Sequence, residues 1–367
     1  MIRGVSNEQV FDESNLYLKF NPLDYAKRVC MIRELPIPGA VNGETFWAVT
    51  EATKVLIRSL LLILAVLHKA GFCFEYLGLD SVLISGEGRF KIKKQHVLLK
   101  ALGPNGKGID TDYDMARILI QALLVESCGQ DIMTKISRDF ISLFSLMKVS
   151  SKSSEYHIQT HVCLLPLSSW SLVFRKFYNE VRYVLGRDDP VLQRIVYSDI
   201  KHVGWGIQAE RNPLLKKWLL YRPGAYDFDE AYSQLDLMRN VDAHQMDKET
   251  YPDGQLQFLL YATFPDVLSQ IQNVLFRHGR IGHLHIEEDF NDGKSHILSS
   301  MPRVHPSAVS TSSSKDLSGL KFLVNNVIEN KGGFRSGAGH GGGIGCSSAN
   351  GGGTGKSVCP DGSKPAK

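Results

Sequence analysis

Residues Tyr226 to His244 read Tyr-Asp-Phe-Asp-Glu-Ala-Tyr-Ser-Gln-Leu-Asp-Leu-Met-Arg-Asn-Val-Asp-Ala-His, and the rest of the chain is interpreted outward from this stretch. Its later part predicts a helix, because apolar residues recur at spacings of three and four and would place one stripe against a core. The residues of this stripe are Ala231, Leu235, Met238 and Val241. Asn240 and His244 are one turn apart on the same face, and Arg239 lies beside them. A turn at Pro223-Gly224 precedes Tyr226 and would deliver its phenol to this face.

These four side chains suit the cleavage of RNA without a metal ion. In that reaction the 2′-hydroxyl loses a proton as it attacks the adjacent phosphorus, and the departing 5′-oxygen gains one. Histidine titrates near neutral pH and can act as general acid or base. Arginine can hold phosphate oxygens and neutralise charge that grows in the transition state, tyrosine can relay a proton, and asparagine can donate to a phosphate. The pattern alone is more often that of solvated helix residues with a histidine at the C-terminal end.

A family resemblance favours the catalytic interpretation. Tyr226, Arg239, Asn240 and His244, followed by Phe264-Pro265-Asp266-Val267-Leu268, resemble the kinase-extension nuclease (KEN) domain of the inositol-requiring-enzyme stress sensors and of ribonuclease L. The resemblance implies that His244 is the general acid and that Tyr226 handles the proton of the 2′-hydroxyl. It also implies that Arg239 and Asn240 hold the phosphate and that cleavage leaves a 2′,3′-cyclic phosphate end.

The chain departs from the family pattern at two places. Val241, Asp242 and Ala243 stand where the family carries basic residues between the Asn and the His, and Thr263 stands where it carries an Arg. Asp242 is expected to place a negative charge beside the phosphate site and to weaken RNA binding there.

The preceding part of the chain predicts a long apolar helix from Glu44 to Lys69, which Gly71 ends. Two short apolar runs follow, Phe74–Ile84 and Phe90–Ile92, and the Gly86-Glu87-Gly88 turn between them is typical of a hairpin. A long helix ending in Leu-His-Lys-Ala-Gly, then strand, turn and strand, resembles the C-lobe of a protein kinase around its catalytic loop.

On that alignment the catalytic and metal-binding groups of a kinase are all replaced. Phe74, Glu75 and Tyr76 stand at the His-Arg-Asp positions, Ser81 at the metal-binding Asn, and Lys94-Gln95-His96 near the Asp-Phe-Gly region. Phosphoryl transfer needs those groups to orient the hydroxyl and hold magnesium. No glycine-rich loop or Val-Ala-x-Lys motif lies upstream, so neither kinase activity nor ATP binding is expected.

Later segments keep the kinase order. Asp112–Leu119 opens a buried helix, Arg138–Phe144 resembles the helix near the end of the lobe, and His161–Pro166 stands at the closing His-Pro-Phe-type position. Each segment is also an ordinary amphipathic pattern, so the order carries the resemblance. A helix with an aromatic stripe, Trp170–Tyr178, is expected to pack between the two modules.

Composition bounds the function classes. A net charge of +4 does not by itself argue for nucleic-acid binding, although Lys216, Lys217 and Arg222 offer either a phosphate-steering patch or a solvated face. The six cysteines form no CxxC pair and predict neither a zinc site nor a disulfide framework. No secretory signal is recognised, and no apolar run is long enough to span a bilayer, so a soluble, cytoplasmic protein is expected.

The C-terminal region is polar and rich in turns, Ser and Gly, and residues 281–367 are predicted to form a disordered tail. His283, His285 and Glu287 alternate and would point one way in an extended chain, but no core is predicted to hold the segment and no metal site is expected. Leu320–Ile328 is one short apolar helical stripe, which would dock on the protein or on a partner.

We therefore expect a mainly α protein in four parts. These are residues 1–43, unclear or an N-lobe remnant; 44–166, a degenerate kinase-like C-lobe; 167–280, an all-helical KEN-like ribonuclease domain; and 281–367, the disordered tail. The expected function is a metal-independent endoribonuclease without a cofactor, which processes RNA in the unfolded protein response. The expected assembly is a homodimer or a heterodimer with an inositol-requiring-enzyme-type relative. The alternatives are a catalytically weak or inactive adaptor that pairs with such a relative, and a kinase-like scaffold that binds protein substrates.

Overall fold

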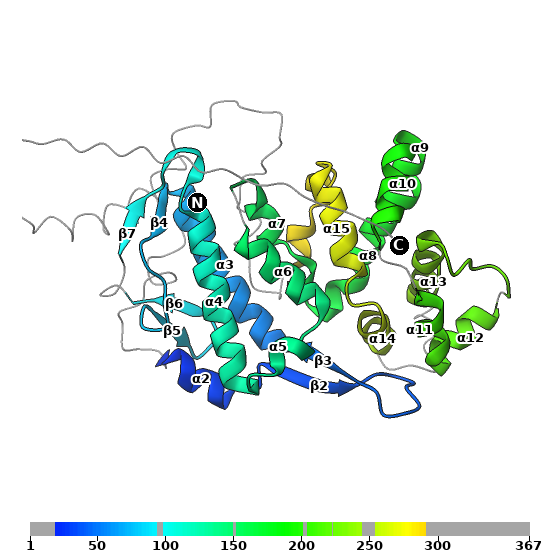
Figure 1. The fold of residues 1–367 in the computed structure, drawn as a ribbon, viewed down its shortest axis with the longest axis horizontal. Coiled ribbons are helices and arrows are strands. Elements are labelled where there is room, and N and C mark those ends of the chain that lie inside the picture. The colour runs from blue at the N-terminus through cyan, green and yellow to red at the C-terminus, as the bar shows by residue number, and fades with distance from the viewer. Residues whose placement is uncertain are drawn as a thin grey trace, which may run out of the picture. The chain divides into compact units, whose positions relative to one another are not determined.

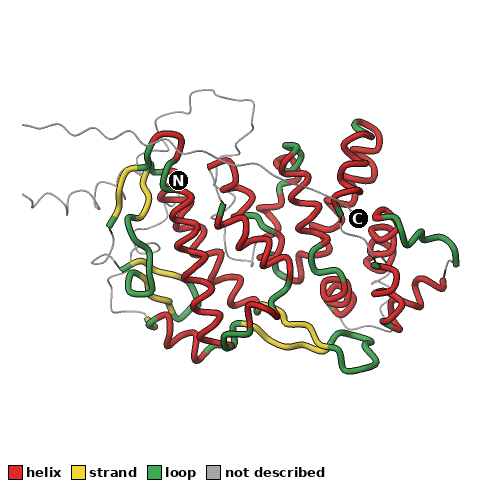
Figure 2. The backbone as a smooth tube through the Cα atoms, viewed as in Figure 1, coloured by secondary structure: helices red, strands yellow, loops and turns green. Residues whose placement is uncertain are grey.

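The computed structural model describes residues 19–93, 98–149, 152–200, 204–221, 223–243 and 254–290. Within these ranges the chain is mainly helical, as predicted, and its strands are short (Figures 1 and 2). No helix in the same ranges is long and apolar enough to cross a membrane. All of them belong to the first of two compact units, residues 1–324.

Helix α3 (Glu51–Lys69) is the long buried helix of the N-terminal half. It begins after Thr50, whose hydroxyl accepts a hydrogen bond from the Thr53 N–H, and it ends before Gly71, which has a φ of 85°. It packs against α4 (Ile109–Cys128). Each fully buried aliphatic side chain contributes about 1.5–3 kcal/mol to folding. Those of α3 include Leu56, Ile57, Leu60, Leu61 and Leu64.

The predicted start of this helix at Glu44 is wrong. Thr45–Val49 forms strand β3, which pairs antiparallel with β2 (Ile32–Pro36), so that Ile32 lies opposite Val49. Threonine, phenylalanine, tryptophan and valine favour extended structure over helix, and the cap at Thr50 starts the helix only at Glu51. Part of the segment that the sequence left unclear is therefore one arm of a hairpin.

Two further small sheets lie in this half. The predicted hairpin is confirmed: β5 and β6 pair antiparallel, with Leu83 opposite Lys91, and Gly88 turns the chain with a φ of 71°. A third strand, β1, pairs with β5, and β4 pairs with β7 separately. The bounds are β1 (Lys19–Phe20), β4 (Phe72–Phe74), β5 (Val82–Ser85), β6 (Phe90–Ile92) and β7 (Leu99–Ala101).

The helices predicted around Asp112 and from Arg138 are confirmed as helices. Asp112 lies in the first turn of α4, and Arg138 is the first residue of α6, which packs against α4. The remaining elements are α2 (Pro22–Arg28), α5 (Ile132–Lys135), α6 (Arg138–Lys148), α7 (Glu155–Gln159), and 3-10 turns at Pro104–Gly106, Lys152–Ser154 and Val162–Leu164.

The C-terminal half is built on α8 (Leu167–Asn179), the predicted aromatic helix. Trp170 and Phe174 are buried and stack with ring centroids 5.5 Å apart. The helix packs against α13, α14 and α15. The other elements are a π-helix at Glu180–Leu185, α9 (Gly186–Asp188), α10 (Pro190–Asp199), α11 (Trp205–Arg211), α12 (Pro213–Tyr221), α13 (Ala231–Ala243), α14 (Gln255–Thr263) and α15 (Val267–Arg277).

Residues 281–290 are folded, so the predicted start of a disordered tail at 281 is wrong. They form 3-10 helices at Gly282–Leu284 and Ile286–Phe290, and Ile281, Ile286 and Phe290 are buried. Lys176 Nζ lies 2.6 Å from the Asp289 carboxylate and ties the segment to α8. Residues 291–367, with the apolar stripe at 320–328, lie outside the described residues.

Candidate functional site

Three of the four residues predicted to form the site lie together at the end of α13. The apolar stripe of α13 faces the core as predicted, since its four residues are at most 2% exposed. On another side of the helix, the Asn240 Nδ2 lies 2.9 Å from the Tyr226 hydroxyl, and an Arg239 Nη1 lies 3.1 Å from Asn240 Oδ1. Arg239 is exposed, and the other two are half-buried.

The donors and acceptors in this chain of contacts follow from Arg239. A guanidinium can only donate, so Asn240 must present its carbonyl oxygen to Arg239 and its amide NH2 to Tyr226. The Tyr226 oxygen is therefore an acceptor toward Asn240, and its own proton is directed elsewhere. A phenol held in this way can donate to an oxygen of a bound substrate.

The loop that carries Tyr226 is fixed at several points. Gly224 has a φ of 75° and turns the chain after α12. The Asp227 N–H donates to the Ser233 hydroxyl at 3.0 Å, which ties the loop to the first turn of α13. The Tyr226 ring lies edge-on to the buried ring of Trp205, and the two ring centroids are 6.5 Å apart. Trp205 is the first residue of α11, so this helix supports the Tyr226 side chain.

A second aromatic side chain, Phe228, lies on the same support. Its ring is edge-on to Trp205 at 5.2 Å, and it covers Gly206, where a Cβ would lie within 3 Å of the Phe228 ring atoms. Phe228 is nevertheless 38% exposed. Sequence reasoning assigned no role in this region to Trp205 or Phe228, because Trp205 is far from Tyr226 in the sequence and the Phe228 ring carries no group that the expected chemistry uses.

His244 and Arg222, the other residues predicted near the site, lie outside the described residues. The last described residue of α13 is Ala243, directly before His244. Lys216 and Lys217 are exposed on α12, which packs against α13.

The expectation that Asp242 places a negative charge beside the phosphate site is wrong. Its side chain is 1% exposed and lies 2.5 Å from Arg175 Nε of α8, so its charge is compensated inside the protein. The physical reason is helix geometry: two residues along a helix rotate the side chain by about 200°, so Asp242 faces away from Asn240. Arg175 is a partner that only the folded chain reveals.

The positions aligned with kinase catalytic groups differ in burial. Phe74 is fully buried, Glu75 and Tyr76 are exposed, and Ser81 is buried, with its hydroxyl 3.3 Å from the Gly78 N–H. The Tyr76 phenol is hydrogen-bonded to the neighbouring Asp80 carboxylate. Residues 94–96, aligned with the Asp-Phe-Gly region, lie outside the described residues.

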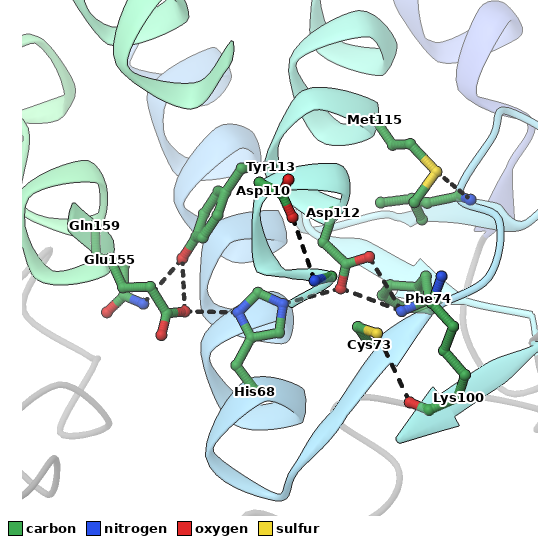
Figure 3. Close-up of polar contacts among 12 residues, drawn as sticks. His68, Cys73, Phe74, Lys100, Asp110, Asp112, Tyr113, Met115, Glu155 and Gln159 are labelled. Atoms are coloured by element: carbon green, nitrogen blue, oxygen red, sulfur yellow. Dashed lines mark hydrogen bonds and ion pairs between the residues drawn. The ribbon is translucent and has the colours of Figure 1, made fainter. Parts of the chain in front are cut away.

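Behind these positions lies a buried polar cluster that sequence reasoning recognised only in part (Figure 3). The Phe74 N–H donates to both carboxylate oxygens of Asp112 at 3.1 Å, and His68 bridges Asp112 and Glu155 through its two ring nitrogens, at 2.9 and 2.6 Å. Burial alone would lower the pKa of His68, but the hydrogen bonds to Asp112 and Glu155 outweigh it and raise this pKa to about 8. The Tyr113 hydroxyl also reaches Glu155. The cluster joins α3, α4, α7 and β4 and is buried at His68 and Asp112, while Glu155 is 18% exposed at its edge, which suits a structural role.

The alternating residues near the C-terminal end form no extended ligand strip. His283 Nε2 lies 2.9 Å from the buried carboxylate of Glu180, which also accepts from Arg280, while His285 lies 3.5 Å from Glu287. Among the described residues no group of three His, Cys, Asp or Glu side chains is arranged to hold a metal ion. The segment is helical rather than extended, so the three side chains do not point one way.

The chain matches no protein-family model and no curated protein.

Proposed function

We propose that this protein is a metal-independent endoribonuclease of the KEN type, which cleaves RNA and leaves a 2′,3′-cyclic phosphate. The observation that supports this proposal most is the contact of Asn240 Nδ2 with the Tyr226 hydroxyl at 2.9 Å. Fourteen positions separate the two residues in the sequence. If the face of α13 that carries Asn240 were only a solvated surface, a contact with the phenol of the preceding loop would not be expected.

The chemistry follows from the donors that this arrangement offers. Arg239 is exposed beside Asn240 and would bind the non-bridging oxygens of the scissile phosphate, where negative charge grows during attack. The Tyr226 hydroxyl would relay the proton of the 2′-hydroxyl: its oxygen would accept that proton during the attack on phosphorus, and its own proton, which is not used in the contact with Asn240, would pass to water. His244 would protonate the departing 5′-oxygen, the role that the KEN resemblance implies. Lys216 and Lys217 on the adjoining helix would attract the RNA backbone.

In this proposal RNA is the substrate, and a homodimer or a heterodimer with an inositol-requiring-enzyme-type relative is the assembly. A role in the unfolded protein response belongs to the same proposal. The rival is a non-catalytic adaptor that pairs with such a relative, and the replaced kinase groups at Phe74, Glu75 and Tyr76 favour it.

The test is cleavage of a labelled stem-loop RNA in EDTA, which removes metal-dependent contaminants. Wild type is compared with His244→Ala and Asn240→Ala, and Asn273→Ala serves as the control because it replaces a half-buried helix asparagine on α15. We expect a cyclic-phosphate end with wild type and the control, and a loss of at least about 100-fold in rate with the two site variants. Cleavage by none of the four proteins, at concentrations that force dimers, would overturn the proposal and favour the adaptor.

A further inference from the structure

The β2–β3 hairpin is firmly held where it leaves the N-terminal half. The Met31 N–H donates to the Ser127 hydroxyl of α4 at 3.3 Å, and the Met31 carbonyl accepts from the Thr53 hydroxyl of α3 at 2.9 Å. Ile32 and Val49, the pair at this end of the ladder, are both buried. The hairpin therefore starts from a fixed base on two long helices.

The middle of the hairpin packs on α14. The ring of Phe46 lies edge-on to Tyr261 at 5.2 Å and to Phe258 at 6.2 Å. Tyr261 is itself tied to α6, because its hydroxyl lies 3.2 Å from the Asp139 carboxylate. Helix α14 is the first described element after α13, so this contact ties the hairpin to the part of the chain that follows α13.

The tip of the hairpin contacts the junction of α11 and α12 (Figure 1). The Asn212 Nδ2 donates to the Pro38 carbonyl at 2.8 Å, across 174 positions of sequence, while Asn212 Oδ1 accepts from the Leu214 N–H at the start of α12. Gly39, which has a φ of 76°, lies against Asn212 and Leu214. A Cβ at Gly39 would be 2.5 Å from Leu214 Cγ and 2.9 Å from Asn212 Oδ1.

From this junction the contacts continue to the site. Asn212 follows α11, whose first residue, Trp205, supports the Tyr226 ring, and it precedes α12, which packs against α13. One hairpin thus touches the elements on both sides of the helix that carries Arg239 and Asn240: α11 and α12 before it, and α14 after it.

We propose that the β2–β3 hairpin is a positioning arm, which holds the Tyr226 loop and the ends of α13 in the geometry that cleavage needs, within a single chain. Its effect on cleavage rests on the proposed ribonuclease function, whereas its effect on the order of α11, α12 and the Tyr226 loop does not.

Two glycines of the hairpin loop provide a matched pair of variants. Gly39 and Gly43 both have positive φ, 76° and 65°, so alanine introduces the same kind of backbone strain at each. Only the Gly39→Ala methyl group would collide with α12, because nothing lies within 4 Å of a Cβ at Gly43. Phe46→Leu and Trp47→Leu form a second pair, since Trp47 contacts Lys135 of α5 rather than α14.

Hydrogen exchange followed by mass spectrometry is the first measurement. We expect Gly39→Ala to speed amide exchange in residues 204–243 by about tenfold relative to Gly43→Ala, and Phe46→Leu to speed it in 255–263 relative to Trp47→Leu. Equal exchange rates within each pair of variants would overturn the proposal that the hairpin is a positioning arm, whether or not the protein cleaves RNA.

The second measurement is steady-state cleavage of the stem-loop RNA by the same four variants. A positioning arm predicts that kcat falls by about tenfold or more in Gly39→Ala with KM little changed, because misplaced groups cost transition-state binding more than substrate binding. Altered exchange with an unchanged kcat would overturn the positioning role. Absence of cleavage by wild type would refute the ribonuclease function, and the exchange result alone would then decide whether the hairpin holds these helices.

Discussion

The stacked histidines His157 and His161 predict that the folded state loses stability as the pH falls. The two rings lie 5.7 Å apart between α7 and α15, and His157 also lies 4.5 Å from the ring of Phe276. Both ring nitrogens of His157 and the Nε2 of His161 have no hydrogen-bond partner in the described part of the chain. Burial lowers the pKa of His157 from 6.5 to about 4, and burial together with His157 lowers the pKa of His161 well below 6.5.

The sign of the effect follows from proton uptake. Because the folded pKa of His157 is depressed, the unfolded chain binds more protons between pH 6.5 and 4, and the folded state loses stability as the pH falls. At about 1.4 kcal/mol per pKa unit, the shift of 2.5 units from 6.5 to 4 removes about 3 kcal/mol of unfolding free energy. This is a large share of the roughly 5–15 kcal/mol that a domain has.

Wild-type stability alone cannot isolate this effect, because another buried group titrates in the opposite sense. Burial raises the pKa of Asp139 from 3.8 to about 6, so the folded state gains protons, and stability, as the pH falls through that range. The useful quantity is therefore the difference between wild type and His157→Phe. Phenylalanine keeps a flat ring against Phe276 and cannot be protonated.

The assay is urea unfolding of wild type and His157→Phe at half-unit steps from pH 7.5 to 4.5. We expect the unfolding free energy of the variant to rise relative to wild type by about 2–3 kcal/mol as the pH falls over this range. His278→Phe, at an exposed histidine just after α15, is the control substitution. A difference for His157→Phe that stays constant from pH 7.5 to 4.5 would refute the reasoning.

The remaining predictions concern other buried contacts. The pKa of His68 is raised from 6.5 to about 8, so the charged His68 stabilises the fold below pH 6.5, and this stability is lost as the pH rises through 8. In urea unfolding between pH 6 and 9, wild type should lose about 2 kcal/mol of unfolding free energy by this effect, and His68→Gln should not. Arg175→Met removes the Arg175 guanidinium from the buried Asp242 carboxylate and should lower the unfolding free energy by about 1–3 kcal/mol, less than for a fully buried pair because the arginine is half-exposed; an unchanged melting temperature would contradict this. Gly206→Ala forces a methyl group into the phenyl ring beside it and should cost about 1–3 kcal/mol in thermal unfolding, whereas Gly282→Ala, which has open space, should cost much less.

The spacing of apolar residues predicted those parts of the fold in which a single helix or hairpin packs its apolar side chains on the core. The stripe of α13 and the β5–β6 hairpin follow from spacing and turn residues, and both are present. The start of α3 was misjudged because Thr45–Val49 contains apolar residues that fit a helical count as well as a strand. Pairing with β2 makes this segment a strand rather than a helix, and the partner strand cannot be identified from the spacing of apolar residues alone.

The site was predictable where its residues lie on one element and less so where they do not. Arg239 and Asn240 follow from the helix, and Tyr226 from the turn before it and from the resemblance. Asp242 was misjudged because sequence neighbours share no face in a helix, and its partner Arg175 lies 67 positions away. The folded 281–290 segment was missed because its core is supplied by α8 and other distant elements rather than by its own pattern.

The junction before α8 joins the N-terminal half of the described chain to the helix on which the candidate site rests. Three polar side chains of α3 hold the backbone that leads into α8: Lys54 donates to the Leu165 carbonyl at 2.8 Å, Arg58 donates to Leu164, and Glu51 accepts from Leu167. Their spacing of three and four places them on one side of α3, where they interrupt an otherwise apolar helix. Lys54 is only 5% exposed, and a buried ammonium is tolerated only when it is hydrogen-bonded. Since α13, α14 and α15 pack on α8, these contacts connect the N-terminal half to the helices around Arg239 and Asn240.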